Sequence, residues 1–438
     1  MAGIFKAYDI RGIYGDTLTE DIATDIGRAF ACFTGARSVA VGYDMRPHSP
    51  PLLKALSRGL TEQGCSVVNV GMCSTPMLYF ACGSLKTDAS IMITASHNPG
   101  EWNGFKMTRA EAVPISGDTG IAGVEKLVEA GDFTPAKQPG TVSEQPVAEP
   151  YKAHVQSMAR LGRPVRIAAD MANAMGGLEA QALDGLIEID PIFETLDGTF
   201  PNHEANPLKA ETLEAVREKV RSGCYDFGVA FDGDADRVGF VDERGEIIAM
   251  DIAGALIAQD LLQAEKGVIF YDLRSSWAVK EVIEEAGGTP MMSRVGHAFI
   301  KQQMRDNNAI YAGEFSGHYY FRRNYFTESS AMAVLCMANI VSGGARPLSE
   351  LIAPIRRYHQ SGEINSRVAD TDAVMERIKA GYGDGHMFLL DGISVEYDDW
   401  WFNVRSSNTE PLIRLNVEAR TQEMMETRRD ALLAEIRR

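Results

Sequence analysis

The sequence contains no apolar run long enough to span a lipid bilayer. Nor do residues 1–11 form an apolar stretch ahead of a cleavage pattern, so we expect no signal peptide and a cytoplasmic location. Basic residues are outnumbered: 43 lysines and arginines face 60 aspartates and glutamates, and the formal net charge is −17. A surface of this sign repels nucleic acid and anionic membranes, so neither is expected as a partner.

Cysteine is also sparse. The six cysteines are scattered and none forms a Cys-x-x-Cys pair, so neither a zinc site nor a thioredoxin-like site is indicated. We interpret them as reduced thiols, which are typical of cytosolic proteins.

What the sequence does contain is an alternation of short apolar runs and amphipathic stretches. Residues 38–42, 66–70 and 89–93 are predicted strands, and residues 52–64 a helix between the first two. This alternation predicts an α/β fold with mainly parallel strands. A chain of 438 residues is too long for one core, so three or four domains are expected.

A weak internal repeat indicates duplicated domains. Tyr43–Arg46 (Y-D-M-R) and Tyr271–Arg274 (Y-D-L-R) each follow an apolar run and precede a helical stretch. The shared letters are few, but the order of the surrounding elements also agrees. We therefore expect more than one copy of the same α/β unit.

Three changes in pattern divide the chain. Residues 134–150, with four prolines, are a predicted linker, and further boundaries are expected near 242–250 and 356–362. Beyond the last boundary the strands and helices predict an α+β domain. The predicted domains cover residues 1–140, 150–245, 246–357 and 360–438.

A serine lies on a tight loop after the predicted strand at 89–93. The loop is Thr94–Pro99 (T-A-S-H-N-P), with Ser96 at its centre. Ligands bind at the carboxyl ends of strands in open α/β sheets, and a serine hydroxyl there can be a nucleophile or a phosphate carrier. The alternative is that Ser96 and Asn98 only shape the loop.

Three aspartates follow another apolar strand, residues 228–231. Asp232, Asp234 and Asp236 can converge on one hard cation, and Gly233 permits the loop to curl around it. Like charges this close repel each other without a cation, although a solvated acidic turn is the alternative. The set predicts one Mg²⁺ per chain, with a phosphate oxygen as a further ligand.

A third loop suits the hydroxyl groups of a sugar. In Gly313–His318 (G-E-F-S-G-H), Glu314 and Ser316 share one face and can bind vicinal hydroxyls. His318 lies on the same face and can move a proton. A simple turn at the end of a strand is the alternative.

A fourth loop suits a phosphate that does not react. Arg405–Pro411 (R-S-S-N-T-E-P) offers a guanidinium, hydroxyls and an amide, and Arg414 follows shortly after. Guanidinium groups bind phosphate through paired hydrogen bonds. The alternative is a hairpin loop with structural serine and asparagine.

Single cations and donors elsewhere would help an acidic protein bind an anion. They are Tyr8, Arg11, Lys106, Arg237, Arg274 and His297.

The order of the motifs resembles the α-D-phosphohexomutase family. To the four loops the resemblance adds Tyr8–Gly12 (Y-D-I-R-G) and, in the second domain, Asp197–Leu208. Several stretches are most similar to bacterial phosphomannomutases. The chain departs from the family pattern at 170–177 and 327–331, where we expect altered packing rather than lost chemistry.

The resemblance implies a fold and an activity. The fold is α/β, with four domains around a central cleft: three similar mixed α/β sandwiches and a C-terminal α+β domain. The activity is the interconversion of hexose 6-phosphate and hexose 1-phosphate through a 1,6-bisphosphate, with mannose favoured and glucose open. The implied partners are a small sugar phosphate as substrate and hexose 1,6-bisphosphate as activator.

The resemblance also implies roles for the residues named above. Ser96 is the phosphoserine and, with Asp232, Asp234 and Asp236, a metal ligand. Arg11, Lys106, Arg237 and His318 serve catalysis beside it. The implied substrate-binding residues are Tyr8, Arg274, His297, Glu314, Ser316, Arg405, Ser407, Asn408, Thr409 and Arg414.

Two other functions remain open on the sequence. With an aspartyl nucleophile at Asp232 the protein would be a sugar phosphatase, and Ser96→Ala would leave its activity largely intact. A noncatalytic sensor of sugar phosphates could use the same fold. A monomer and a homodimer are both compatible with the sequence.

Overall fold

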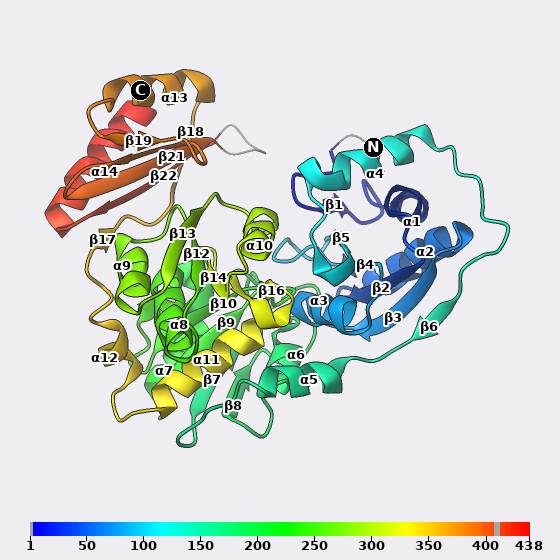
Figure 1. Cartoon of the computed structure of the whole chain (residues 1–438), viewed down its shortest axis with the longest axis horizontal. Coiled ribbons are helices and arrows are strands. Elements are labelled where there is room, and N and C mark those ends of the chain that lie inside the picture. The colour runs from blue at the N-terminus through cyan, green and yellow to red at the C-terminus, as the bar shows by residue number, and fades with distance from the viewer. Residues whose placement is uncertain (1–2, 407–411) are drawn as a thin grey trace.

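The computed structural model describes residues 3–406 and 412–438. Four β-sheets follow one another along the chain, which confirms the α/β prediction. Figure 1 shows the first domain in blue and cyan beside the second and third in green and yellow, and the fourth in orange and red next to the third. No helix of the described residues combines the length and apolar character needed to cross a bilayer.

The first domain is built on a six-stranded mixed sheet. Its strands are β1 (Ile10–Ile13), β2 (Ser38–Tyr43), β3 (Ser66–Met72), β4 (Ala89–Ile93), β5 (Trp102–Arg109) and β6 (Val142–Glu144). Its helices are α1 (Glu20–Thr34), α2 (Ser49–Glu62), α3 (Thr75–Ser84) and α4 (Ala122–Ala130). The predicted linker at 134–150 is thus not wholly a linker, because β6 pairs with β3 and extends this sheet.

The second and third domains each have a five-stranded sheet. The second contains α5 (Ala148–Gln156), β7 (Arg166–Asp170), α6 (Gly176–Gln181), β8 (Glu188–Ile192), α7 (Glu214–Ser222), β9 (Phe227–Phe231), β10 (Val238–Asp242) and β11 (Ile247–Ile248). The third contains α8 (Met250–Ala264), β12 (Val268–Asp272), α9 (Trp277–Glu285), β13 (Thr289–Ser293), α10 (His297–Asp306), β14 (Tyr311–Gly313), β15 (Tyr319–Phe321), β16 (Thr327–Glu328), α11 (Ser330–Ser342) and α12 (Leu348–Ile352).

These three sheets share one strand order. Four neighbouring strands run β3-β2-β4-β5 in the first sheet, β8-β7-β9-β10 in the second and β13-β12-β14-β15 in the third. In each, the first three strands are parallel and the last is antiparallel. The mixed sheets and the repeat predicted from Tyr43–Arg46 and Tyr271–Arg274 therefore have one structural basis, since the two segments lie at the ends of β2 and β12, the second strands of the shared order.

The fourth domain is an antiparallel sheet covered by two helices. Its elements are β17 (His359–Gln360), β18 (Ile364–Arg367), α13 (Thr371–Gly381), β19 (His386–Phe388), β20 (Ile393–Glu396), β21 (Trp400–Ser406), β22 (Leu412–Ala419) and α14 (Gln422–Ile436). Trp400 and Phe402 on β21 pack with Leu415 and Val417 on β22 in a core of its own. The predicted α+β domain is confirmed.

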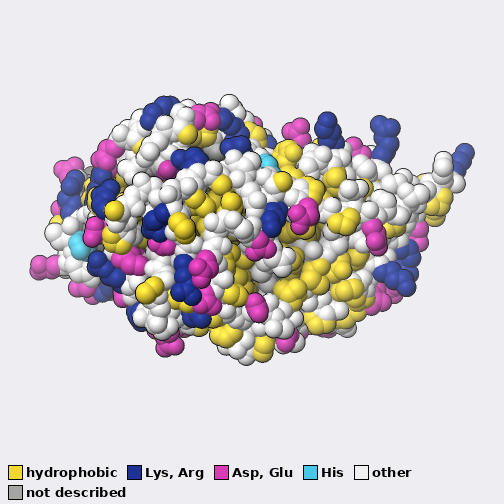
Figure 2. Space-filling model, turned by 90° about the horizontal axis from the view of Figure 1, so that it is seen from below, with side chains coloured by type: hydrophobic (Ala, Val, Ile, Leu, Met, Phe, Trp, Pro, Cys, Tyr) yellow, Lys and Arg dark blue, Asp and Glu magenta, His cyan; other side chains and the backbone are white. Residues whose placement is uncertain are grey.

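The other domains share more of their interior. One apolar cluster runs from Met77 and Phe80 of α3 through Phe231 of the second domain to Leu335 of α11. A second cluster fills the remainder of the first domain. On the face shown in Figure 2, acidic and basic side chains are interspersed, so the net negative charge is not gathered in one patch there.

A buried glutamate joins the first three domains. The side chain of Glu179, at α6, accepts hydrogen bonds from Ser74 Oγ, from Tyr151 OH at 2.9 Å and from Ala331 N at 2.9 Å. These partners come from the first, second and third domains. Burial raises the pKa of Glu179 to about 7 from its ordinary 4.5, against the opposing effect of these hydrogen bonds.

The raised pKa predicts that Glu179 makes stability depend on pH. A carboxyl that holds its proton more tightly when folded favours the folded state at low pH, and this contribution is lost as pH rises from about 4.5 to about 7. It amounts to up to about 3 kcal/mol. We expect Glu179→Gln to weaken this decline, so the variant's thermal midpoint should rise relative to wild type between pH 5 and pH 8. Glu188→Gln, at an exposed position of the same domain, is the control, and parallel curves for Glu179→Gln and wild type would refute the assignment.

Candidate active site

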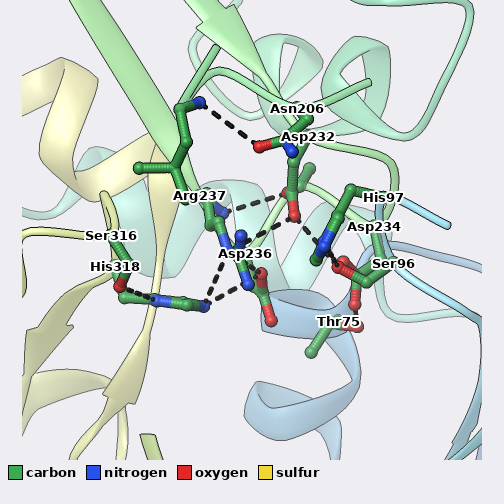
Figure 3. Close-up of polar contacts among 12 residues, drawn as sticks. Thr75, Ser96, His97, Asn206, Asp232, Asp234, Asp236, Arg237, Ser316 and His318 are labelled. Carbon is green, nitrogen blue, oxygen red and sulfur yellow. Dashed lines mark hydrogen bonds and ion pairs between the residues drawn. The ribbon is translucent and has the colours of Figure 1, made fainter. Parts of the chain in front are cut away.

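Three loops meet where the first three domains come together, and each occupies the same place in its sheet. Each connects the third strand of the shared order to its antiparallel neighbour: 94–101 between β4 and β5, 232–237 between β9 and β10, and 314–318 between β14 and β15. In Figure 3 Ser96 and His318 approach from opposite sides, with Asp232 and Asp236 between them. The loops that the sequence singled out are therefore brought together.

The hydroxyl of Ser96 points at the loop at 232–237, which carries the three aspartates and is called the acidic loop below. Its Oγ lies 3.1 Å from Asp232 Oδ2 and 3.1 Å from His97 Nδ1. Its backbone is in the left-handed region, with φ of 53°, a conformation that costs a residue with a side chain about 1–3 kcal/mol. Burial, together with the charges of Arg237 and Arg11, holds the pKa of His97 well below its usual range, so this imidazole is neutral. His97 was not among the predicted site residues.

The three aspartates form a compact, buried set of oxygen donors. One carboxylate oxygen from each lies within 4.8 Å of one from each of the others. Asp234 Oδ1 is buried without a hydrogen-bond partner among the described residues, and Asp236 Oδ1 is buried with His318 Nε2 3.3 Å away. Burial and the neighbouring charges of Asp236 and Asp234 raise the pKa of Asp232 to about 8. Such a set fits a hard divalent cation, which would satisfy the free oxygen and relieve the repulsion.

Three cations surround this group. Lys106 Nζ lies 2.6 Å from Asp234 Oδ2 and 2.5 Å from Asp236 Oδ2. Arg237 Nε lies 3.8 Å from Asp232 Oδ2. Arg11 is held by Asp9 at 2.8 Å and donates to the carbonyl oxygen of Ala95 in the serine loop at 3.3 Å. The positive charge that an anionic substrate would require is thus present beside Ser96.

The loop at 314–318, called the sugar loop below, contacts the acidic loop through His318. Ser316 Oγ donates to Glu314 Oε2 at 2.8 Å, and His318 Nδ1 lies 2.8 Å from the same hydroxyl. On its other side, His318 Nε2 lies 3.3 Å from Asp236 Oδ1. Burial alone would lower the pKa of His318, but Asp236 and the hydrogen bond with Glu314 raise it to about 9. The imidazole therefore connects the groups predicted to bind sugar with those predicted to bind metal.

Tyr8 and His297 lie next to this loop. The Tyr8 and His297 ring centroids are 5.4 Å apart, and the His297 and His318 rings are stacked at 6.3 Å. One turn along α10, Lys301 forms a fully buried ion pair of 2.7 Å with Glu328. Neither partner of this pair was predicted, although Lys301 shares a helix face with His297, four residues earlier.

The remaining predicted cations gather elsewhere, around a glutamate that was not predicted. Glu363 Oε2 lies 2.7 Å from Arg405 Nη2 and 3.4 Å from Arg274 Nη1, and Glu363 Oε1 lies 3.7 Å from Arg414 Nη1. Burial raises the pKa of Glu363, but Arg274 and Arg405 outweigh this and lower it. Ser407, Asn408 and Thr409 lie outside the described residues. The site therefore has two centres of positive charge.

Comparison with known proteins identifies relatives along the whole chain. Four family models match in order: phosphoglucomutase/phosphomannomutase alpha/beta/alpha domain I at residues 2–135, domain II at 148–245, domain III at 249–358 and the C-terminal domain at 363–435. A phosphomannomutase of Salmonella typhimurium is 41% identical, with 98% of each chain covered. A phosphoglucomutase of Neisseria gonorrhoeae is 38% identical, with 97% of this chain and 94% of that protein covered.

A solved structure agrees. The crystal structure of a phosphoglucomutase/phosphomannomutase family protein from Burkholderia thailandensis superposes with a TM-score of 0.92 at 33% identity. The match covers 99% of this chain and 96% of that one.

Proposed function

The chain belongs to the phosphoglucomutase/phosphomannomutase family and is a hexose phosphate mutase, and from that premise we propose that Ser96 carries the phosphate that it moves between C6 and C1. The observation that carries the proposal is the contact of 3.1 Å between Ser96 Oγ and Asp232 Oδ2, which joins the serine loop to the acidic loop. The phosphatase and the noncatalytic sensor are not favoured, because the relatives are mutases.

The proposed reaction has two transfers. In the first, the bond between Ser96 Oγ and phosphorus breaks while the free hydroxyl of the bound sugar monophosphate forms a bond to phosphorus and gives up its proton. The resulting 1,6-bisphosphate turns over, and its other phosphoryl group returns to Ser96 by the reverse step. Such transfers depend mainly on positioning and on stabilising charge.

The residues around Ser96 divide this work. Arg11, Lys106 and Arg237 offset the charge of the phosphoryl group as it moves. The proton that the sugar hydroxyl gives up ends on Ser96 Oγ, the oxygen released when the bond to phosphorus breaks. His318, which holds a proton because its pKa is raised to about 9, exchanges protons along this path, since its imidazole lies where the loop at 314–318 meets the loop at 232–237. Glu314 and Ser316 hold sugar hydroxyls beside it, flanked by Tyr8 and His297.

One Mg²⁺ per chain fits the donors of Asp232, Asp234 and Asp236, with the Ser96 phosphate as a further ligand. When bound, the ion supplies positive charge to the transferring phosphoryl group.

The second centre of positive charge receives the phosphate that does not react. Arg405, Arg414 and Arg274 lie together there, and Ser407, Asn408 and Thr409 are assigned to the same phosphate on sequence. Because the bisphosphate must turn over, this cradle has to accept the sugar in both orientations. Hexose 1,6-bisphosphate is the proposed activator, since it would phosphorylate an empty Ser96. Every assigned residue belongs to one chain, so a monomer suffices, and the unpaired cysteines suit a cytoplasmic location.

The test combines mass and activity. Intact mass of the purified protein should show one labile phosphate that maps to the peptide containing Ser96. Coupled assays with mannose 1-phosphate and glucose 1-phosphate, each primed with the matching bisphosphate, should show turnover of both, with the higher kcat/KM for mannose. Release of inorganic phosphate with an aspartyl adduct would instead identify a phosphatase.

A further inference from the structure

Arg46, one residue of the internal repeat, has no part in the proposed chemistry, but its side chain hydrogen-bonds to the backbone of the loop that carries Ser96. Its side chain is fully buried. Nη2 donates to the carbonyl oxygens of Ser96 at 2.9 Å and Asn98 at 2.6 Å. Nη1 donates to those of Pro99 at 2.6 Å and Trp102 at 2.9 Å. One guanidinium thus binds the backbone at four points, three in the loop and one at Trp102, the first residue of β5.

Asp44 and Phe200 hold the guanidinium of Arg46 in place. Asp44 Oδ2 accepts from Arg46 Nε at 3.2 Å, and Asp44 Oδ1 accepts from the Arg46 N–H at 3.1 Å and from Ser49 Oγ at 2.7 Å. The ring of Phe200, from the second domain, lies 5.1 Å from the guanidinium carbon. Arg46 therefore has little freedom to turn, because its partners lie on both sides of it.

The carbonyl oxygen of Ser96 belongs to a residue with a strained backbone conformation. Ser96 has a φ of 53°, which a serine adopts only when its surroundings enforce it. Its carbonyl oxygen also packs against Gly233 of the acidic loop, where an added Cβ would lie 2.1 Å from it. The conformation that directs Oγ at Asp232 is thus secured through the backbone, and Arg46 supplies the donor at this carbonyl.

The third domain repeats the device. Asp272, the last residue of β12, and Arg274 correspond to Asp44 and Arg46 in the internal repeat and form an ion pair of 2.7 Å. Asp272 Oδ2 accepts from the N–H of Phe315 in the sugar loop at 2.9 Å, and Arg274 lies 5.3 Å from the Phe315 ring centroid. In both domains an aspartate and an arginine at the end of the second strand of the shared order hold the functional loop that follows the third.

From this geometry we propose that Arg46 is a positioning residue for phosphoryl transfer: it holds the Ser96 loop in the one conformation that presents Oγ to the acidic loop. The inference rests on the proposed role of Ser96. Lysine cannot replace Arg46, because its single ammonium group cannot reach four separated carbonyl oxygens. The planar guanidinium of arginine reaches all four, since its N–H groups point in different directions. Substrate contacts in the third and fourth domains do not involve Arg46, so binding and transfer can be separated.

The experiment compares Arg46→Lys and Arg46→Met with wild type in the bisphosphate-primed mutase assay. We expect kcat to fall about 100-fold in Arg46→Lys and further in Arg46→Met, with KM for the sugar phosphate within about threefold of wild type. Phosphorylation of Ser96 by hexose 1,6-bisphosphate, followed by intact mass, should slow by the same factor as kcat. Arg28→Lys and Arg28→Met are the matched controls, since Arg28 is an ion-paired arginine of the same domain remote from the loop, and they should keep wild-type kcat.

Three results would overturn the inference. They are an Arg46→Lys variant with at least half the wild-type kcat, an equal effect of the Arg28 substitutions, and loss of the folded state in both Arg46 variants, which would assign the residue to stability alone. Ser96→Ala is measured in parallel to separate the two proposals. If Ser96→Ala remains active, the role of Ser96 fails; if it is inactive while the Arg46 variants are not, only the role of Arg46 fails.

Discussion

Ser96→Ala is expected to abolish mutase turnover, with kcat lower by about 10⁴- to 10⁶-fold. Without the hydroxyl there is no atom to carry the phosphoryl group between the two ends of the sugar, and the neighbouring groups have nothing to act on. The variant should fold, because within the described part of the chain Oγ hydrogen-bonds to His97 and Asp232 and to no other residue. The measurement is the primed coupled assay, with intact mass to show that the bisphosphate no longer adds phosphate.

Ser90→Ala is the matched control for this variant. Ser90 is a buried serine on β4, and its hydroxyl bonds to Thr108 rather than to any group near Ser96. It should keep nearly full activity. If Ser96→Ala retained more than a few per cent of wild-type kcat, the phosphate carrier would be another residue, and the aspartyl mechanism at Asp232 would return.

Asp234→Asn is expected to weaken divalent-cation binding and to lower kcat by about 10³-fold at a fixed, moderate Mg²⁺ concentration, equivalent to ~4 kcal/mol. The substitution keeps the shape of the side chain but removes a charge and replaces a carboxylate oxygen by an amide nitrogen. One oxygen of this carboxylate is free of hydrogen bonds within the described chain and suits a metal ligand. Binding of Mn²⁺, followed by its electron paramagnetic resonance signal, reports affinity without reference to activity.

The control for the metal prediction lies in the same domain. Asp226 is a partly buried aspartate that pairs with Arg163 at 2.6 Å, and Asp226→Asn should bind Mn²⁺ as wild type does. Treatment of wild type with a chelator should stop turnover, and added Mg²⁺ should restore it. Unchanged Mn²⁺ affinity in Asp234→Asn would mean that the cation binds elsewhere.

The parts of this fold that the sequence predicts are those encoded by adjacent residues. The strands at 38–42 and 89–93 are recognisable because they are short and mostly apolar, as expected of buried strands, and the loops after them stand out as polar segments at strand ends. The fourth domain is also readable, since its strands alternate in the manner of an antiparallel sheet with a core on one side. Residues 142–144 could not be recognised as a strand, because all three are exposed and, among the described residues, they pair with the distant β3 alone.

The residues that the sequence missed act through partners far along the chain. Glu363 matters because it meets Arg274, 89 residues away, and nothing near position 363 signals this. Lys301 and Glu328 form their ion pair between α10 and β16, and each alone resembles an ordinary charged residue. Arg46 was visible as part of a repeat, but its use depends on carbonyl oxygens that no pattern of side chains encodes.

Because the first three domains share one strand order, the proposed site is distributed over three separate domains. Ser96 comes from one copy of the unit, Asp232, Asp234 and Asp236 from the next and Glu314 from a third, so on the proposed assignment no single copy holds the complete site. Fragments cut at a domain border should be inert separately and regain turnover only on re-association.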